Sequence, residues 1–298
     1  MSVHSKVTRL VVHPGLTDRT LSPVRYGQEV AQRGLHGLYL PEHTHIPVAY
    51  EPSDYPQDAE LPDRYKRLLD PYIALSFVAA TTDIEIGTCV SLVGQHDPIV
   101  LAKQVATLDL LAGGRFTLGV GFGWNTREFA SHSPALPLAR PDVVREHVEL
   151  MTSIWTQDIA SYSGRHVALP PSWSWPKPAQ RPRPPVLLGA RPTRRNFERI
   201  CSWADGWISL TGYLHSPRYP EYLDRLRGAW VDCGRPLDQL RIMALEDPEV
   251  APIPASYERA VGLGLDAFIL HIEDRPADVA LPLLDEAVKA LGSVQAAS

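Results

Sequence analysis

Cysteine is scarce in this sequence of 298 residues, which contains only Cys89, Cys201 and Cys233. The number is odd, and no two cysteines have the Cys-x-x-Cys spacing that is typical of zinc and redox motifs. A disulfide framework and a structural zinc site are therefore not expected.

Long apolar runs are also missing. No stretch reaches the roughly 18 apolar residues of a membrane-spanning helix. The first residues, Met1 to Lys6, do not lead into the apolar core of a signal peptide. The net charge of −5 leaves no positive excess to neutralise the phosphates of nucleic acid or of anionic lipid. We therefore expect a cytoplasmic protein without a nucleic-acid or membrane partner.

Short β-branched or apolar runs alternate with longer amphipathic runs along the whole chain, which is typical of strand–helix units in a parallel sheet. Strands are predicted at residues 7–12, 37–40, 84–90, 116–120, 185–188, 206–210, 240–245 and 267–271. Helices are predicted at residues 23–33, 70–81, 98–111, 141–155, 193–203, 219–232, 256–263 and 279–291. This pattern predicts the α/β class and a (β/α)₈ TIM barrel that forms a single domain over residues 1–298.

A doubly wound sheet is the alternative fold. Its Gly-rich fingerprint would follow the first strand, where His13-Pro14-Gly15-Leu16 does not supply it. Prolines interrupt the alternation between the fourth and fifth strands. We predict that residues 162–184 form a proline-rich insertion loop that acts as a lid.

The active site of such a barrel lies at the carboxyl ends of its strands. Eight short segments follow the predicted strands and are the candidates for chemistry. They are His13, Glu42-His43, Cys89-Val90-Ser91, Gly121-Phe122-Gly123-Trp124-Asn125, Gly189-Ala190, Thr211, Glu246 and His271-Ile272-Glu273.

Three separated motifs in these regions carry a resemblance to a known family. They are Leu38 to His43; the run from Ile86 through His96-Asp97-Pro98 and Ala112-Gly113-Gly114-Arg115-Phe116 to Gly121; and Pro185 to Ala190 followed by Ala204-Asp205-Gly206-Trp207. In order and spacing, they resemble the luciferase-like family of flavin- and coenzyme F420-dependent oxidoreductases. The resemblance implies a barrel of the bacterial-luciferase type and a bound flavin or deazaflavin.

The resemblance also implies where the cofactor binds. In similar proteins the third strand ends in a bulge with a non-proline cis peptide that supports the ring, and the matching bond is Cys89-Val90, followed by Ser91. Gly121, Gly123 and their neighbours Phe122, Trp124 and Asn125 would let backbone N–H groups approach the cofactor. Gly189-Ala190 and Arg194, at a helix start, would bind its phosphate, and His13 would complete the site.

His43 is the expected catalytic residue, because an imidazole exchanges protons near neutral pH. Glu42 is expected to orient His43 or to bind the cofactor. The alternative interpretation is that His43 is a structural hydrogen-bond partner and not a catalytic residue. His43 and His45 also have the His-x-His spacing with which amidohydrolase-type metal sites begin, but the histidines that such a site needs on the middle strands are absent from the predicted strand ends. No metal is therefore expected.

The stretches from Gly119 to Phe129 and from Glu42 to Pro47 most resemble the branch of the family that uses coenzyme F420. We therefore predict hydride transfer between this deazaflavin and a small, apolar or aromatic substrate at a C=O, C=C or C=N bond. FMN-dependent monooxygenation, supplied by a separate reductase, is the alternative, and a barrel that binds the cofactor without turnover is a third interpretation. Family members generally pair through helices near the second and third strands, and the apolar run Tyr72 to Ala80 predicts a homodimer face.

Overall fold

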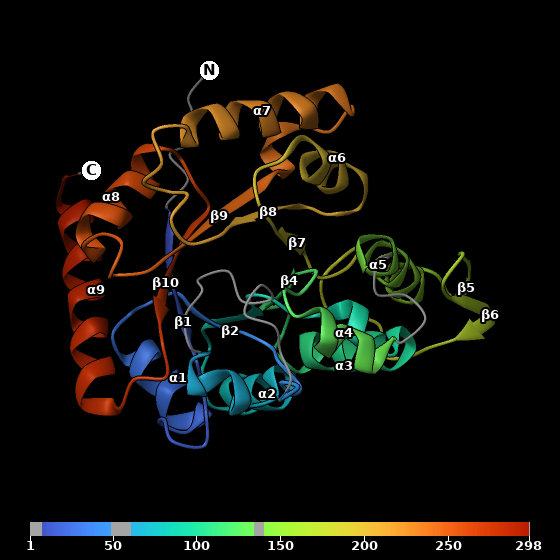
Figure 1. The fold of residues 1–298 in the computed structure, drawn as a ribbon, viewed down its shortest axis with the longest axis horizontal. Coiled ribbons are helices and arrows are strands. Elements are labelled where there is room, and N and C mark those ends of the chain that lie inside the picture. Colours follow the sequence, from blue (N-terminus) through green and yellow to red (C-terminus); the bar gives the residue numbers. More distant parts are fainter. Residues whose placement is uncertain (1–7, 49–60, 134–139, 298) are drawn as a thin grey trace.

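The computed structural model describes residues 8–48, 61–133 and 140–297. Eight parallel strands close into a barrel in the spatial order β1-β10-β9-β8-β7-β4-β3-β2 (Figure 1). The (β/α)₈ prediction is confirmed, and the doubly wound alternative is excluded. The barrel strands are β1 (Arg9–Pro14), β2 (Gly37–Leu40), β3 (Glu85–Thr88), β4 (Phe116–Val120), β7 (Val186–Gly189), β8 (Gly206–Ser209), β9 (Arg241–Glu246) and β10 (Ala267–Ile272).

Helices surround the barrel, and several begin as their sequences predict. Ser22, Asp70 and Asp97 accept hydrogen bonds from the first free N–H groups of α1, α2 and α3, and a proline follows each cap. The helices are α1 (Pro23–Gln32), α2 (Pro71–Thr81), α3 (Pro98–Leu111), α4 (Thr126–His132), α5 (Arg140–Thr156), α6 (Arg194–Trp203), α7 (Tyr219–Asp232), α8 (Ile253–Gly262) and α9 (Ala277–Ala297), with short 3₁₀ turns η2 (Asp63–Lys66), η3 (Val93–Gln95) and η4 (Leu237–Gln239). Helix α4 was not predicted. Within the described ranges, none of these helices is long and apolar enough to cross a membrane.

Apolar side chains fill the interior of the barrel. Val11, Tyr39, Leu187, Met243 and Ile269 belong to this inner cluster and are fully buried. Because side chains alternate between the two faces of a strand, the residues two positions further along each strand face the same interior. At the carboxyl end of the barrel, where the active site is expected, these residues include His13 on β1 and His271 on β10.

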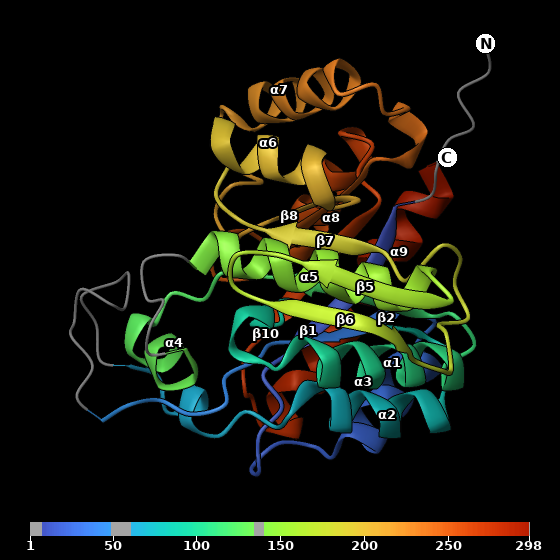
Figure 2. The ribbon, with the colours of Figure 1, turned by 90° about the vertical axis from the view of Figure 1, so that its right-hand side faces the viewer.

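Part of the predicted insertion loop is regular structure. Strands β5 (Ile159–Ser163) and β6 (Ala168–Trp173) form an antiparallel hairpin that lies along the outer side of α5 (Figure 2). The expectation of an irregular loop over this stretch is wrong. Pro170 and Pro171 fit into β6 because a two-stranded sheet consists of edge strands, where a missing N–H group is tolerated.

The chain after the hairpin runs past the outer helices to the N-terminal end of the barrel. The ammonium of Lys177 donates to the carbonyls of Ile154 and Gln157, both at 2.6 Å. The amide of Gln180 donates to Asp109 and to the carbonyl of Phe116, both at 2.7 Å. Phe116 begins β4, so these contacts lie at the end of the barrel remote from the expected active site. They give no support to a lid role for this segment.

Candidate active site

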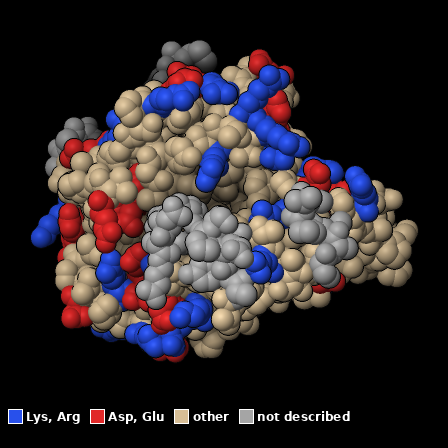
Figure 3. All heavy atoms as spheres, in the orientation of Figure 1, with Lys and Arg blue, Asp and Glu red and all other residues tan. Residues whose placement is uncertain are grey.

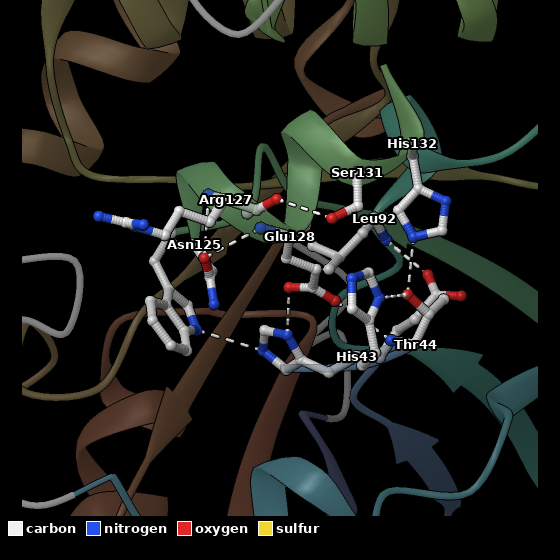
Figure 4. A network of polar contacts seen from close by, with 12 residues as sticks. His43, Thr44, Leu92, Asn125, Arg127, Glu128, Ser131 and His132 are labelled. Atoms are coloured by element: carbon white, nitrogen blue, oxygen red, sulfur yellow. Dashed lines mark hydrogen bonds and ion pairs between the residues drawn. The ribbon is translucent and has the colours of Figure 1, made fainter. Parts of the chain in front are cut away.

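His43 lies in the loop after β2 and contacts three other segments of the chain. Its Nδ1 lies 2.7 Å from Oε2 of Glu128, and the indole N–H of Trp124 donates to its Nε2 over 3.2 Å (Figure 4). The ring of Tyr65 meets the imidazole edge to face, with centroids 5.2 Å apart. Because Nε2 accepts the indole proton, the imidazole is neutral and its own proton sits on Nδ1, where it is donated to Glu128. The structure therefore fixes the tautomer in which the Nε2 lone pair faces the indole of Trp124.

Glu128 is held in place by the start of α4. The side chain of Asn125 caps this helix and accepts hydrogen bonds from the N–H groups of Arg127 and Glu128, both at 3.1 Å. The carboxylate of Glu128 is fully buried, and its Oε1 accepts the N–H of Thr44 at 3.1 Å. One oxygen thus fixes the backbone of the loop that carries His43, while the other orients the imidazole.

Sequence reasoning did not assign this role to Glu128. An acidic residue three positions after an Asn cap is an ordinary feature of helix starts, so nothing in the local pattern separates it from a capping residue. Glu128 is also far from His43 along the chain, so the sequence alone does not indicate that the two side chains are in contact.

Glu42 does not contact His43, so the first of its two expected roles, orienting the imidazole, is not found. Its Oε2 accepts hydrogen bonds from the Ser91 hydroxyl at 2.7 Å and from the Leu92 N–H at 2.6 Å, and its Oε1 lies 2.7 Å from Nε2 of His96. Both oxygens are therefore occupied by the segment that follows β3, and neither contacts His43. The orienting role expected of Glu42 belongs to Glu128. Glu42 instead fixes the position of the 91–96 segment.

Charge strengthens the contact between Glu42 and His96. Burial alone would raise the pKa of Glu42, but the hydrogen bond and charge of His96 hold it below its ordinary value. Burial would likewise lower the pKa of His96, and the same contact raises it instead. The two groups therefore form a buried ion pair over a broad range of pH.

The peptide bond between Cys89 and Val90 is cis, as the resemblance implied. The carbonyl of Cys89 accepts a hydrogen bond from Nε2 of His13 at 2.6 Å. A Cβ atom at Gly121 or at Gly189 would overlap the methyl groups of Val90, so both glycines are required for the Val90 side chain to lie across β4 and β7. These three residues therefore pack against one another at the carboxyl ends of β3, β4 and β7.

The side chains of the other two residues of this bulge, Ser91 and Cys89, are not positioned to react with a ligand. Ser91 accepts a hydrogen bond from the hydroxyl of Tyr72 at 2.7 Å and donates to Glu42, so its side chain faces α2. Burial raises the pKa of Cys89 to about 12, which keeps the sulfur a thiol and excludes a nucleophilic role near neutral pH. The side chains of Ser91 and Cys89 are therefore not available to a ligand.

Phe122 was expected beside the cofactor, and Gly189-Ala190 and Arg194 were expected to bind its phosphate. Phe122 lies under the guanidinium of Arg199, which is 5.3 Å from the ring centroid. The carbonyl of Ala190 accepts the indole N–H of Trp207 at 2.8 Å. The Arg194 side chain is exposed and pairs with Glu198 at 2.8 Å on the surface of α6. Lys and Arg side chains gather over α6 and α7 on the face shown in Figure 3.

His43 and His45 do not converge. The ring of His45 faces His132, with centroids 5.4 Å apart, whereas His43 faces Glu128 and Trp124. The two imidazoles therefore contact different partners, an arrangement that does not match the beginning of a His-x-His metal site.

Comparison with known proteins identifies the family. The model of the family described as luciferase-like monooxygenase matches residues 13–291. The chain belongs to the luciferase-like family. It is 42% identical over 279 residues to an uncharacterized protein of Mycobacterium tuberculosis, a match that covers 90% of this chain and 94% of that protein.

Solved structures share the fold at low sequence identity. The monooxygenase RslO1 from Streptomyces bottropensis superposes with a TM-score of 0.77 at 17% identity, covering 97% of this chain and all of that one. An F420-dependent secondary alcohol dehydrogenase in complex with an F420–acetone adduct gives a TM-score of 0.72 at 13% identity, covering 95% and 98%. Curated relatives that match shorter stretches include both FMNH₂-dependent and F420-dependent enzymes. The family therefore contains oxidoreductases and monooxygenases, and both cofactors occur in it.

Proposed function

We propose that this protein is a coenzyme F420-dependent oxidoreductase that transfers a hydride between the deazaflavin and a small, uncharged organic substrate. The observation that carries the proposal is the neutral imidazole of His43, which Glu128 and Trp124 orient at the mouth of a barrel where Gly121 and Gly189 leave room for the side chain of Val90. An oriented base and a flat support are the two parts that hydride chemistry on a ring system needs from a protein.

The residues present fit a flat ring. Gly121 and Gly189 have no room for a Cβ atom, and the Val90 side chain that fills this room would contact one face of the ring. Nδ2 of Asn125 and Nδ1 of His13 are buried without a hydrogen-bond partner among the described residues. Such atoms are usual next to a polar ligand. Coenzyme F420, when bound here, would supply a carbon that accepts or releases a hydride.

The chain itself would handle the proton. When an alcohol is oxidised, its O–H group would replace the indole N–H of Trp124 as the donor to Nε2 of His43 and would pass its proton to that nitrogen, while the hydride leaves the carbon that carries the hydroxyl group. Nδ1–H would remain hydrogen-bonded to Glu128. The imidazolium so formed is stabilised by the buried carboxylate. In the reverse direction, the imidazolium returns the proton to the carbonyl oxygen. Trp124 and Tyr65 pack against the imidazole and limit the access of water to it.

The choice of F420 over FMN rests on the resemblance of residues 119–129 and 42–47 to the deazaflavin branch. FMN-dependent monooxygenation is the second candidate, because the structural neighbours include a monooxygenase. A binding protein without turnover is the third candidate, and the oriented His43–Glu128 pair argues against it because ring binding alone does not need a positioned base.

The residue at position 124 supports an uncharged substrate. In the family's sugar-phosphate dehydrogenases a carboxylate follows the glycine group and a tryptophan follows the Asp-His pair. The matching residues here are Trp124 and Pro47. Trp124 places an indole beside His43, which suits an apolar or aromatic substrate better than a phosphorylated sugar.

We also propose that the protein forms a homodimer in the cytoplasm. On α2 the side chains of Ile73 and Phe77 are 61% and 55% exposed, and with Ala74 they line an apolar groove against the start of α1. Exposed apolar side chains that cluster in this way mark association surfaces. If FMN were the cofactor, a reductase would be a second partner.

A turnover screen tests the proposed function. The purified protein is incubated without oxygen with F420 and a panel of secondary alcohols, and with reduced F420 and the matching ketones and activated alkenes. The expected result is a substrate-dependent change in F420 absorbance. Substrate-dependent oxygen consumption with reduced FMN, and no change with F420, would overturn the proposal.

A further inference from the structure

Two cysteines are in contact where helices α6 and α7 end. Cys201 lies in the last turn of α6, and Cys233 is the C-cap residue of α7. The two helices lie side by side on the outside of the barrel, as Figure 1 and Figure 2 show. The thiol of Cys201 donates a hydrogen bond to the sulfur of Cys233. Both are free thiols in this structure.

Arg235 fixes the end of α7 against the end of α6. Its guanidinium donates to the carbonyl of Cys201 at 3.3 Å and to that of Ala204 at 2.6 Å. The same guanidinium lies 3.6 Å from the ring centroid of Trp230, and the backbone N–H of Arg235 donates to the Trp230 carbonyl. Cys233 lies between these two residues in the sequence. The contact between the thiols therefore follows from the packing of two helix ends and not from one flexible side chain.

The two thiols differ in their access to solvent. Cys201 is 6% exposed, whereas Cys233 is on the surface. Burial and the neighbouring Cys233 raise the pKa of Cys201 to about 11, so this sulfur keeps its proton near neutral pH. An oxidant in solution reaches Cys233 first and finds a second thiol directly behind it. An accessible thiol beside a protected one is the arrangement of cysteines that are oxidised reversibly.

We propose that Cys201 and Cys233 form a dithiol site that hydrogen peroxide converts into an intramolecular disulfide. The sulfur of Cys233 attacks one peroxide oxygen, the O–O bond breaks, and a sulfenic acid forms with release of one water molecule. The sulfur of Cys201 then attacks the sulfenic sulfur and forms the S–S bond. The sulfenic oxygen leaves as a second water molecule with the proton of Cys201. Two electrons pass from the two sulfurs to the peroxide, and a dithiol reductant reverses the change.

The disulfide would tie α6 to α7 at the end of the barrel remote from the candidate active site. Cys201 and Ala204 lie just before Gly206, the first residue of β8. The closed loop contains β8 and α7, and its closure restricts the unfolded chain, which stabilises the folded state. The disulfide also protects the exposed sulfur of Cys233 from irreversible oxidation to sulfinic acid. The proposal does not rest on the identity of the cofactor.

The test uses the reduced, full-length protein, which is treated with hydrogen peroxide and then freed of it with catalase. Free thiols are counted after denaturation, and tryptic peptides are identified by mass spectrometry. The chain has three cysteines, and only the thiol of Cys89 should remain after oxidation. The protein should lose the mass of two hydrogen atoms, and the peptide with Cys201 should be linked to the peptide with Cys233. Dithiothreitol should restore all three thiols.

The two serine variants separate the roles of the cysteines. In Cys201→Ser, the sulfenic acid of Cys233 has no second thiol to attack it, so dimedone should trap it. In Cys233→Ser, the remaining thiol is buried, and it should react with peroxide at least about tenfold more slowly than Cys233 does in the wild type. Oxidation should raise the Tm of the wild type by about 5 °C and should not raise that of Cys201→Ser.

Three results would overturn the proposal. They are three intact thiols after peroxide treatment, oxidation of Cys233 to sulfinic acid without a linked peptide, and a disulfide that joins two molecules through Cys233. The peptide analysis of the wild-type protein does not depend on the folding of either variant.

Discussion

Nδ1 of His43 and Oε2 of Glu128 lie 2.7 Å apart although the two residues are separated by 85 positions in the chain. The loop after β2 carries one, and the first turn of α4 after β4 carries the other. Closure of the barrel brings these strand ends to the same rim, and the Asn125 cap fixes the helix that presents the carboxylate. The pair therefore depends on the fold as a whole rather than on a local motif.

Replacing His43 by Ala removes the proton-transfer group and leaves the bulge intact. We expect turnover to fall by about 10²- to 10⁴-fold, which is the usual contribution of a general acid–base residue. Affinity for the cofactor should change little, because His43 contacts Glu128, Trp124 and Tyr65 rather than the glycine-lined surface. Single-turnover kinetics and equilibrium binding measure the two effects separately. A large loss of binding with normal turnover of the bound fraction would contradict the role.

Glu128→Gln tests whether the carboxylate orients the imidazole. Glutamine has one acceptor oxygen where Glu128 uses two, for the Thr44 N–H and for His43. We expect a turnover loss of about 10- to 100-fold, smaller than that caused by removal of the imidazole. The ¹⁵N spectrum of His43 provides a readout that a merely structural role would not change, because the Nδ1–H tautomer should lose its dominance. An unchanged tautomer in a folded, slow variant would refute the orienting role.

The Glu42–His96 pair should make stability depend on pH. The depressed pKa of Glu42 stabilises the folded state above pH 4.5, and this contribution is lost as the pH falls through the folded value. The raised pKa of His96 stabilises the folded state below pH 6.5, and this contribution is lost as the pH rises through the folded value. The pair is therefore fully effective between these two values.

Glu42→Gln should lower the free energy of unfolding at pH 6 by about 2–4 kcal/mol, since it removes a buried charge that has three partners. The variant should also lose the decrease in the free energy of unfolding that the wild type shows toward low pH and toward high pH. Urea unfolding of the wild type and the variant, repeated across the pH range, measures the two free energies of unfolding. If wild type and variant differ by a constant amount at every pH, the ion pair is not the source of the dependence.

A comparison of Gly121→Ala with Gly228→Ala tests whether packing at the bulge supports the cofactor. The second variant controls for effects that any glycine-to-alanine substitution has. Gly121→Ala places a methyl group against Val90 and should weaken cofactor binding. Gly228, in the middle of α7, has open space where a Cβ atom would lie, and Gly228→Ala should raise stability by about 0.5–1 kcal/mol. Cofactor titrations and thermal unfolding of both variants test the comparison. Equal cofactor affinity in the two variants would show that the bulge does not support the ring.

We predict that the homodimer forms through the apolar face of α2 that contains Ile73 and Phe77. Phe77→Asp introduces a charge into the exposed apolar groove and should convert a dimer into a monomer at micromolar concentration. Val231→Asp is the matched control, because Val231 is 52% exposed on α7, outside this face. Light scattering of the three proteins gives the masses. A monomeric wild type, or a dimeric Phe77→Asp, would exclude this interface.

The barrel could be predicted because short apolar runs alternate with longer helical runs along the chain, and this alternation is local information. His43 could be found for the same reason, since it directly follows a strand. Glu128 could not, because its partner lies far along the chain. The hairpin β5–β6 was missed because Pro170 and Pro171 signal a loop, and only the two-stranded, edge-only sheet makes them compatible with a strand.

The role of Glu42 shows a different limit. Two side chains that are adjacent in sequence contact the same partner only if the backbone allows it, and Glu42 contacts Ser91, Leu92 and His96 rather than His43. Adjacent residues at a strand end can therefore serve different structural units. The Glu-His pattern predicted one common role for both side chains, whereas the structure shows that they contact different segments of the chain.

The most direct test of the central claim is equilibrium binding of the purified apo-protein to coenzyme F420 and, separately, to FMN, followed by quenching of tryptophan fluorescence. Trp124 contacts His43 at the mouth of the barrel and serves as a reporter. Tight binding of F420 with weak binding of FMN is the predicted result and agrees with a deazaflavin hydride-transfer enzyme. Tight binding of FMN with weak binding of F420 would contradict the account and identify the oxygenase of a two-component system.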